Sequence, residues 1–310
     1  MTRLSQGPRQ YSGGMRPVRS RLHLPLLLFA LLAVSRAASA GSAAEGIAEA
    51  DRLWSVRGDG ATSGLVESSR IDPVLAACRR AIEADPESLE PRWRLMRAFY
   101  FKGEYTTRDP GEQKRIFDEG KAAGEEAFLL VRKKVASAAR RSTDKDGPVA
   151  LAPDAKEIPG AVPTFLWAGV NWGKWALVFG KGAAARQGVA GKIRDYAQAV
   201  ILMDPKYDDG AGYRLLGRVH HQTPSIPFIT GWASRSEALK NLEQAVKTGP
   251  ENFYNRLYYA EALWDYEASR RAEARKRLEA LAAEAPKPDW AVEDRRVQEE
   301  AKELLAAWSR

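Results

Sequence analysis

Apolar residues recur at helical spacing through most of the chain after residue 70. In one example, Val74, Leu75 and Cys78 fall on one face of a stretch that begins with Asp72-Pro73. An aspartate followed by proline is typical of a helix start, because the aspartate can cap backbone N–H groups and proline fits the first turn. Alternating runs rich in Val, Ile and Thr are missing from the sequence, so the pattern predicts an all-α fold.

The same pattern predicts a series of helices. A short one lies around Ile47–Trp54, and a long one runs from Pro110 to Ala139. Residues 140–160 are polar, contain three prolines and lack periodicity, so we expect an irregular insertion there. Further helices are predicted at Pro163–Ala184, Val189–Met203, Ala211–Gln222, Arg235–Thr248, Asn252–Ala268, Arg271–Ala285 and Ala291–Trp308.

The helices repeat in pairs. Similar helix ends precede Pro205, Pro250 and Pro286, which lie 45 and 36 residues apart, close to tetratricopeptide-type repeat lengths. Because one pair cannot bury its own apolar face, we expect a cryptic tetratricopeptide-like α-solenoid bundle. It forms one domain over residues 71–310, after a helix and linker over residues 41–70. The expected repeat-packing residues are Trp93, Met96, Tyr100, Tyr213, Leu216, Gly217, His220, Tyr254 and Leu257.

Residues 1–40 have the pattern of a secretory signal peptide. They contain six arginines and no acidic residue, then the apolar run Leu22–Val34, then Ala38-Ser39-Ala40 as a cleavage motif. Retention of this segment as an anchor is the alternative. Its removal lowers the formal net charge from +8 to +2, which weakens any argument for nucleic-acid binding. We therefore expect a periplasmic protein with no membrane span after cleavage.

The single cysteine, Cys78, cannot form an internal disulfide. Its apolar neighbours favour a buried, unreactive thiol. Because no cysteine follows the apolar run Leu22–Val34, the lipid-attachment site of a bacterial lipoprotein is also missing.

Two apolar segments are the candidate binding surfaces. The predicted helix from Pro163 is apolar nearly all round, which indicates either the central core helix or a face that meets a ligand or another subunit. Lys174 and several glycines argue against a membrane span. The loop Thr223–Trp232 is longer than a repeat turn needs, and we expect its side chains to pack on that helix or on a neighbouring subunit. The candidate surface residues are Phe165, Trp172, Trp175, Phe179, Ile226, Phe228, Ile229 and Trp232.

Sequence patterns that would indicate catalysis or metal binding are weak. His220 and His221 are the only histidines after residue 40, and adjacent residues on a helix point about 100° apart, so they do not form a metal pair. The nearby Asp204, Asp208 and Asp209 lack a metal-ligand spacing. Because nucleophile, phosphate-loop and zinc motifs are missing from the sequence, we expect a protein that is not an enzyme and has no cofactor or metal. A hydrolase that uses His221 and an aspartate is the weakest alternative.

The stretch Ala197–Ala262 resembles the TRAP transporter T-component (TatT) family. The resemblance is carried by Ala199–Gly217, by the proline-bearing loop, and by Glu237–Ala245 and Asn252–Glu261, and it extends over roughly residues 70–285. It implies a periplasmic all-helical protein that forms trimers with an apolar pore and associates with the transporter's substrate-binding component. Members of the family are lipoproteins, and this chain departs from them in the missing cysteine.

The expected function is therefore that of a non-catalytic periplasmic accessory or scaffold protein. It would bind a partner protein, with a hydrophobic or organic-acid ligand as a further expectation, and would be a homo-oligomer. The alternative is a tetratricopeptide-like envelope module for protein–protein interaction that has no part in transport.

Overall fold

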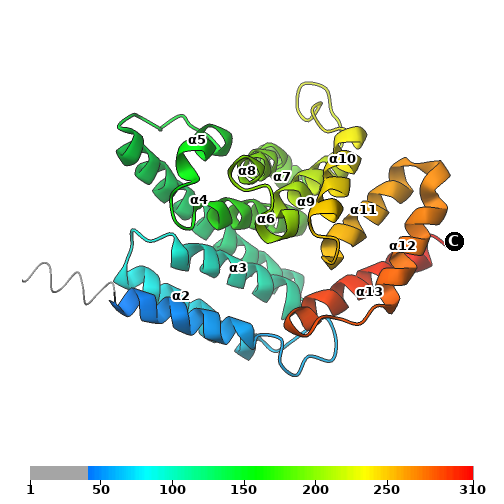
Figure 1. Ribbon diagram of the computed structural model, residues 1–310, viewed down its shortest axis with the longest axis horizontal. Coiled ribbons are helices and arrows are strands. Elements are labelled where there is room, and N and C mark those ends of the chain that lie inside the picture. The colour runs from blue at the N-terminus through cyan, green and yellow to red at the C-terminus, as the bar shows by residue number, and fades with distance from the viewer. Residues whose placement is uncertain (1–40, 310) are drawn as a thin grey trace, which may run out of the picture.

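The computed structural model describes residues 41–309 and is helical almost throughout (Figure 1). No β-strand occurs within this range, so the prediction of an all-α helical bundle is confirmed. A first helix covers residues 41–55, as expected around Ile47–Trp54. The other elements are η1 (Ser68–Arg70), α2 (Asp72–Ala84), α3 (Glu90–Tyr105), α4 (Pro110–Ala139), α5 (Pro148–Ala155), α6 (Ala161–Phe179), α7 (Lys181–Arg186), α8 (Val189–Met203), α9 (Tyr207–Gln222), α10 (Arg235–Thr248), α11 (Phe253–Tyr266), η2 (Ala268–Arg270), α12 (Arg271–Ala283), η3 (Pro288–Trp290) and α13 (Ala291–Ala307). The predicted signal peptide lies outside the described residues.

Most helix ends follow the local sequence signals. Helices α4, α8 and α10 have the predicted bounds, and Asp109 and Ser234 cap α4 and α10 through their side chains. The helix predicted over Pro163–Ala184 is instead divided into α6 and α7, because Gly180 adopts a φ of 87° that a helix does not allow.

The start of α9 contains a turn of left-handed residues. Asp208, Asp209 and Gly210 have φ angles of 47°, 58° and 77°, so regular helix begins at Ala211 as predicted. Left-handed backbone is costly for residues other than glycine. Here it is held by Arg214, which donates to Asp208 Oδ2 at 2.8 Å, and by buried Asn255, which donates to the Asp209 carbonyl at 2.9 Å.

The prediction of an irregular insertion over residues 140–160 is wrong in its central part. Residues 148–155 form α5, which packs against α8. Leu151, Ala152 and Ala155 are fully buried, so the segment belongs to the core. The three prolines of residues 140–160, two of them within α5, concealed the helix, although Pro148 occupies a first-turn position where proline is tolerated.

Consecutive helices pack as the predicted pairs. At the α9–α10 crossing, a Cβ on Gly217 would lie 2.6 Å from Leu242 Cγ, so only glycine allows this approach. Met96, Leu216, His220 and Leu257 are buried. The other predicted repeat residues, Trp93, Tyr100, Tyr213 and Tyr254, are half-buried, and Gly217 is buried.

The two ends of the described chain meet. α13 contacts α3 and covers the segment that follows the first helix (Figure 1). Arg57 makes two hydrogen bonds to buried Glu293, at 2.8 and 2.6 Å, and the Gly64 amide donates to Glu299 at 2.9 Å. The region predicted as a linker is thus fixed against the last helix, which joins the two ends of the described chain.

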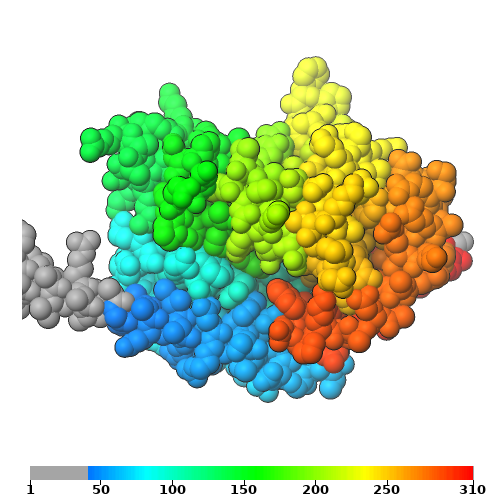
Figure 2. All heavy atoms as spheres, in the orientation of Figure 1, coloured from blue at the N-terminus to red at the C-terminus, as the bar shows by residue number. Residues whose placement is uncertain are grey.

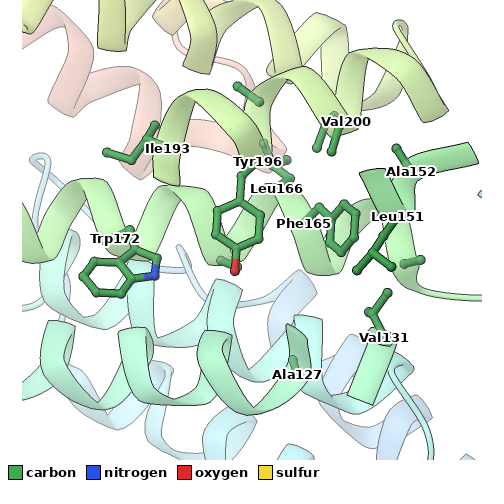
Figure 3. Close-up of a cluster of buried hydrophobic side chains, with 14 of the residues drawn as sticks. Ala127, Val131, Leu151, Ala152, Phe165, Leu166, Trp172, Ile193, Tyr196 and Val200 are labelled. Carbon is green, nitrogen blue, oxygen red and sulfur yellow. The ribbon is translucent and has the colours of Figure 1, made fainter. Parts of the chain in front are cut away.

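Helix α6 occupies the middle of the molecule, between α4, α8 and α3 (Figure 1). Its Phe165, Leu166 and Trp172 are buried and contact a core that also includes Val131 of α4 and Tyr196 of α8 (Figure 3). The interpretation of this segment as the central core helix is therefore confirmed. Among helices within residues 41–309, none combines the length and the apolar character that a bilayer crossing requires.

Candidate functional site

The aromatic residues of α6 do not form a surface in this chain. Phe165 and Trp172 are almost completely buried, and Trp175 is 6% exposed and donates its indole N–H to Asp118 at 2.9 Å. Only Phe179, stacked on Trp175 with ring centroids 4.5 Å apart, is appreciably exposed. The prediction of a ligand or oligomer face is wrong for the first three, because neighbouring helices cover these three side chains.

The tip of the loop 223–232 is exposed in this chain, so the first part of the prediction, packing on the aromatic helix, is wrong for the tip, while packing on a neighbouring subunit stays a prediction. Ile226, Phe228 and Ile229 are 45%, 107% and 68% exposed. In Figure 2 the loop stands out from the rest of the surface as a yellow projection. Trp232 alone behaves as expected: it packs against the α6 core and lies edge-on to His220, with ring centroids 5.2 Å apart.

The loop is internally hydrogen-bonded although its tip is exposed. Thr230 Oγ1 accepts from the Ile226 amide at 3.1 Å and donates to the Pro224 carbonyl at 2.5 Å. The amides of Ile229 and Thr230 both donate to the Ile226 carbonyl. Phe228 has a left-handed φ of 62°, which costs roughly 1–2 kcal/mol in a residue with a β-carbon. The loop therefore forms a defined turn that presents its apolar residues outwards.

A second feature lies where α3, α6, α11 and α13 surround the middle of the molecule (Figure 1). We call it the central cluster. Lys174, the only charged side chain of α6, donates to the Glu104 carboxylate. Arg296 of α13 lies 3.7 Å from Glu104 and 3.4 Å from Glu300. The members of the central cluster are Tyr100, Glu104, Tyr105, Lys174, Tyr254, Tyr258, Arg296 and Glu300.

Tyrosine hydroxyls connect α3 with α11 within the central cluster. The Tyr105 hydroxyl lies 2.7 Å from that of Tyr254 and 3.1 Å from that of Tyr100. Burial raises the pKa of Tyr100, Tyr105 and Tyr254, so all three are neutral and can both donate and accept hydrogen bonds.

Charge pairing outweighs burial for the central ion pair. Burial alone would raise the pKa of Glu104, but the charge of Lys174 and its hydrogen bond lower it overall. Burial alone would lower the pKa of Lys174. The negative charge of Glu104 outweighs burial and raises this pKa overall. Glu300 differs because burial dominates and raises its pKa. Glu104 and Lys174 are 10% and 20% exposed, so the pair is mostly buried but not completely removed from solvent.

The polar face continues from the central cluster to α9. Arg218 donates to Glu261 at 2.6 Å, and its guanidinium lies 4.2 Å from the centre of the Tyr258 ring. Arg218 and Glu261 are 28% and 18% exposed. Half-buried arginine and tyrosine side chains of this kind dominate many recognition surfaces.

His221 lies beside two carboxylates of α11. Its Nε2 is 2.9 Å from Asp265 Oδ2, and ligand atoms of His221, Glu261 and Asp265 lie within 4.8 Å of one another, which is a geometry that could hold a metal ion. Arg218 already supplies positive charge there, because it pairs with Glu261 and lies 3.2 Å from His221 Nδ1. Guanidinium only donates, so Nδ1 accepts and Nε2 carries the proton toward Asp265. The nitrogen that a general base would use is thus occupied by Arg218.

In the central cluster each acid faces a base. Cys78 is fully buried, as predicted, and burial raises the pKa of its thiol to about 12. Two surface hollows lie elsewhere, one at Arg256 and Lys276 and one between α2, α3 and α4.

Sequence reasoning did not find the central cluster, because its members come from four helices far apart in the chain. One signal was available: Lys174 interrupts the most apolar helix of the chain after residue 40. A lysine inside such a helix requires a buried counter-charge, which is Glu104. No protein-family model matches this chain, and no curated protein has significant sequence similarity to it.

Proposed function

We propose that this protein is a non-catalytic periplasmic binding protein that serves as an accessory subunit of an uptake system similar to the TRAP type. The observation that carries the proposal is the central cluster together with Arg218 and Glu261. It concentrates tyrosine, arginine and paired carboxylate side chains where α3, α6, α9, α11 and α13 approach one another.

Several properties of this surface support recognition. Its ionic groups remain partly exposed, at 10–28%, so an incoming partner can reach them without unfolding the protein. The guanidinium of Arg296 lies beside the carboxylates of both Glu104 and Glu300, so the surface carries charges of both signs. Neutral tyrosine hydroxyls add donors and acceptors at low cost in side-chain entropy.

The proposed partner is the periplasmic substrate-binding component of the transporter. The support comes from the signal-peptide pattern of residues 1–40 and from the resemblance over Ala197–Ala262. By the same resemblance, we propose a homo-oligomer, a trimer, and a hydrophobic or organic-acid ligand. The missing lipid-attachment cysteine makes a protein released into the periplasm the favoured form.

The test measures association of the purified protein with the substrate-binding component of a TRAP-type transporter from the same genome. We expect binding by titration calorimetry, weakened at least tenfold in Arg218→Ala because a half-buried arginine beside tyrosine is typical of an interface hot spot. The matched control is Arg256→Ala. Arg256 is 21% exposed and pairs with Glu284 at 2.7 Å, but lies outside the central cluster. Light scattering on the same samples measures the oligomeric state.

A complex unaffected by Arg218→Ala would place the binding surface elsewhere. If the substrate-binding component does not bind while an unrelated envelope protein does, and Arg218→Ala abolishes that binding, the alternative of an interaction module outside transport is favoured. A strict monomer that binds neither would overturn the proposal.

A further inference from the structure

The exposed loop 223–232 has a layered composition. Its tip consists of Ile226, Pro227, Phe228 and Ile229, and no charged residue occurs from Gln222 to Ser234. Below the tip lies a layer of aromatic and basic side chains, which we call the collar. In the collar, the guanidinium of Arg194 lies 4.7 Å from the centre of the Trp232 ring, and that of Arg235 lies 5.3 Å from the Tyr266 ring.

The backbone of the tip exposes few hydrogen-bond donors. Pro224 and Pro227 have no N–H group, and the amides of Ile226, Ile229 and Thr230 donate within the loop. An apolar medium penalises unsatisfied backbone groups by several kcal/mol each in general, so an internally bonded turn is suited to enter one. The left-handed backbone of Phe228 is part of the same turn, and the ring points outwards.

We propose that the tip inserts into the interfacial region of a phospholipid bilayer and holds the protein reversibly at a membrane surface. The order of the layers matches the bilayer: apolar side chains meet acyl chains, while tryptophan, tyrosine and arginine lie at the headgroup level. Arg194 is paired with Asp195 at 2.8 Å, so the collar contributes only a modest preference for anionic lipid, and the apolar tip provides most of the binding.

A lipid surface suits the loop better than a protein groove does. The tip projects from the molecule in Figure 2, and its four residues offer no polar side chain that could form directional bonds with a partner. Protein interfaces usually surround an apolar centre with a hydrogen-bonding rim. Membrane contact is independent of the central cluster, because none of the loop residues belongs to it.

The test is residue-specific. Phe228→Trp is mixed with vesicles of phosphatidylcholine and phosphatidylglycerol, with bromine on the acyl chains as a fluorescence quencher. We expect added quenching relative to the wild type, because the new indole enters the acyl region. The matched control is Leu129→Trp, at a 58% exposed position on α4, which should show no added quenching. This readout separates the tip from the apolar segment Leu22–Val34, which every variant shares.

A second measurement is the partition coefficient of Phe228→Ser/Ile229→Ser. We expect a loss of about tenfold or more, since each large apolar side chain withdrawn from lipid costs that much, whereas Leu129→Ser should bind as the wild type does. Equal partitioning of tip variant and wild type, or no added quenching of Phe228→Trp, overturns the proposal. If the tip variant instead partitions as the wild type does but no longer binds the substrate-binding component, the tip is a protein contact and the lipid assignment is wrong. The proposed transport function is tested separately through Arg218→Ala.

Discussion

Helix α6 and the loop 223–232 are both apolar, aromatic segments, and the sequence suggests a binding surface for each. They end in opposite environments. Phe165 and Trp172 of α6 are buried among α3, α4 and α8, whereas Phe228 in the loop is fully exposed. Composition alone therefore does not decide burial.

The difference lies in what surrounds each segment. A helix that is apolar on every side needs neighbours on every side, and the consecutive pairs before and after α6 provide them. The loop leaves the stack between α9 and α10, and only its base, through Trp232, contacts the core. An apolar residue held outside the core by a defined backbone is evidence for a contact with something beyond the chain.

Trp172→Ala provides the largest test of this contrast. Removal of the buried indole leaves a cavity, and we expect the free energy of unfolding to fall by about 3–5 kcal/mol. Phe228→Ala, which removes an exposed ring, should change it by less than about 0.5 kcal/mol. Urea denaturation followed by circular dichroism measures both. Similar losses in the two variants would mean that the loop is buried in solution.

His220 lies at the base of the loop, and we expect its protonation to change the free energy of unfolding by an intermediate amount. Its Nδ1 accepts from the Ser234 amide at 3.1 Å, and burial lowers its pKa below the usual 6.5. The unfolded chain therefore binds a proton more readily than the folded protein, and stability is lost as pH falls from 6.5 through the folded-state pKa. The expected loss is on the order of 1 kcal/mol, the value of one hydrogen bond.

The free energy of unfolding is measured from denaturation curves at pH 7.5 and at pH 5.5. His220→Gln retains an acceptor for Ser234 but does not titrate, so the difference between the two pH values should be smaller in this variant than in the wild type. An unchanged difference would show that other groups produce it.

Phe228→Asn should have the smallest effect on stability, and its sign is informative. Asparagine tolerates the left-handed φ of 62° better than phenylalanine does. Because no buried area is lost, we expect the free energy of unfolding to stay equal or rise by a few tenths of a kcal/mol, within the limit of about 1–2 kcal/mol set by the backbone strain. Differential scanning calorimetry measures the shift. A clear fall in the melting temperature would mean that the Phe228 ring makes stabilising contacts in the folded protein.

Local patterns were sufficient for most of the fold. Caps such as Asp109 and Ser234, and the helical spacing of apolar residues, gave α4, α8 and α10 their predicted bounds. They failed at α5, where tertiary burial of Leu151 and Ala152 stabilises a helix that contains Pro153. They could not reveal the central cluster, because the approach of Glu104, Lys174 and Arg296 depends on the curvature of the whole stack.

The contact between the last helix and the segment after the first has a consequence for folding. In an open solenoid, repeats contact only their neighbours, so terminal repeats can fray or be removed one at a time. Here the buried Arg57–Glu293 pair joins residues 236 positions apart in the sequence. Loss of α13 would remove both Glu293, the partner of Arg57, and buried Val292, which packs in the core of the first helix, α2 and α3, and would destabilise the opposite end of the chain. The protein should therefore unfold as one cooperative unit, and truncation or insertion of a repeat should be tolerated poorly.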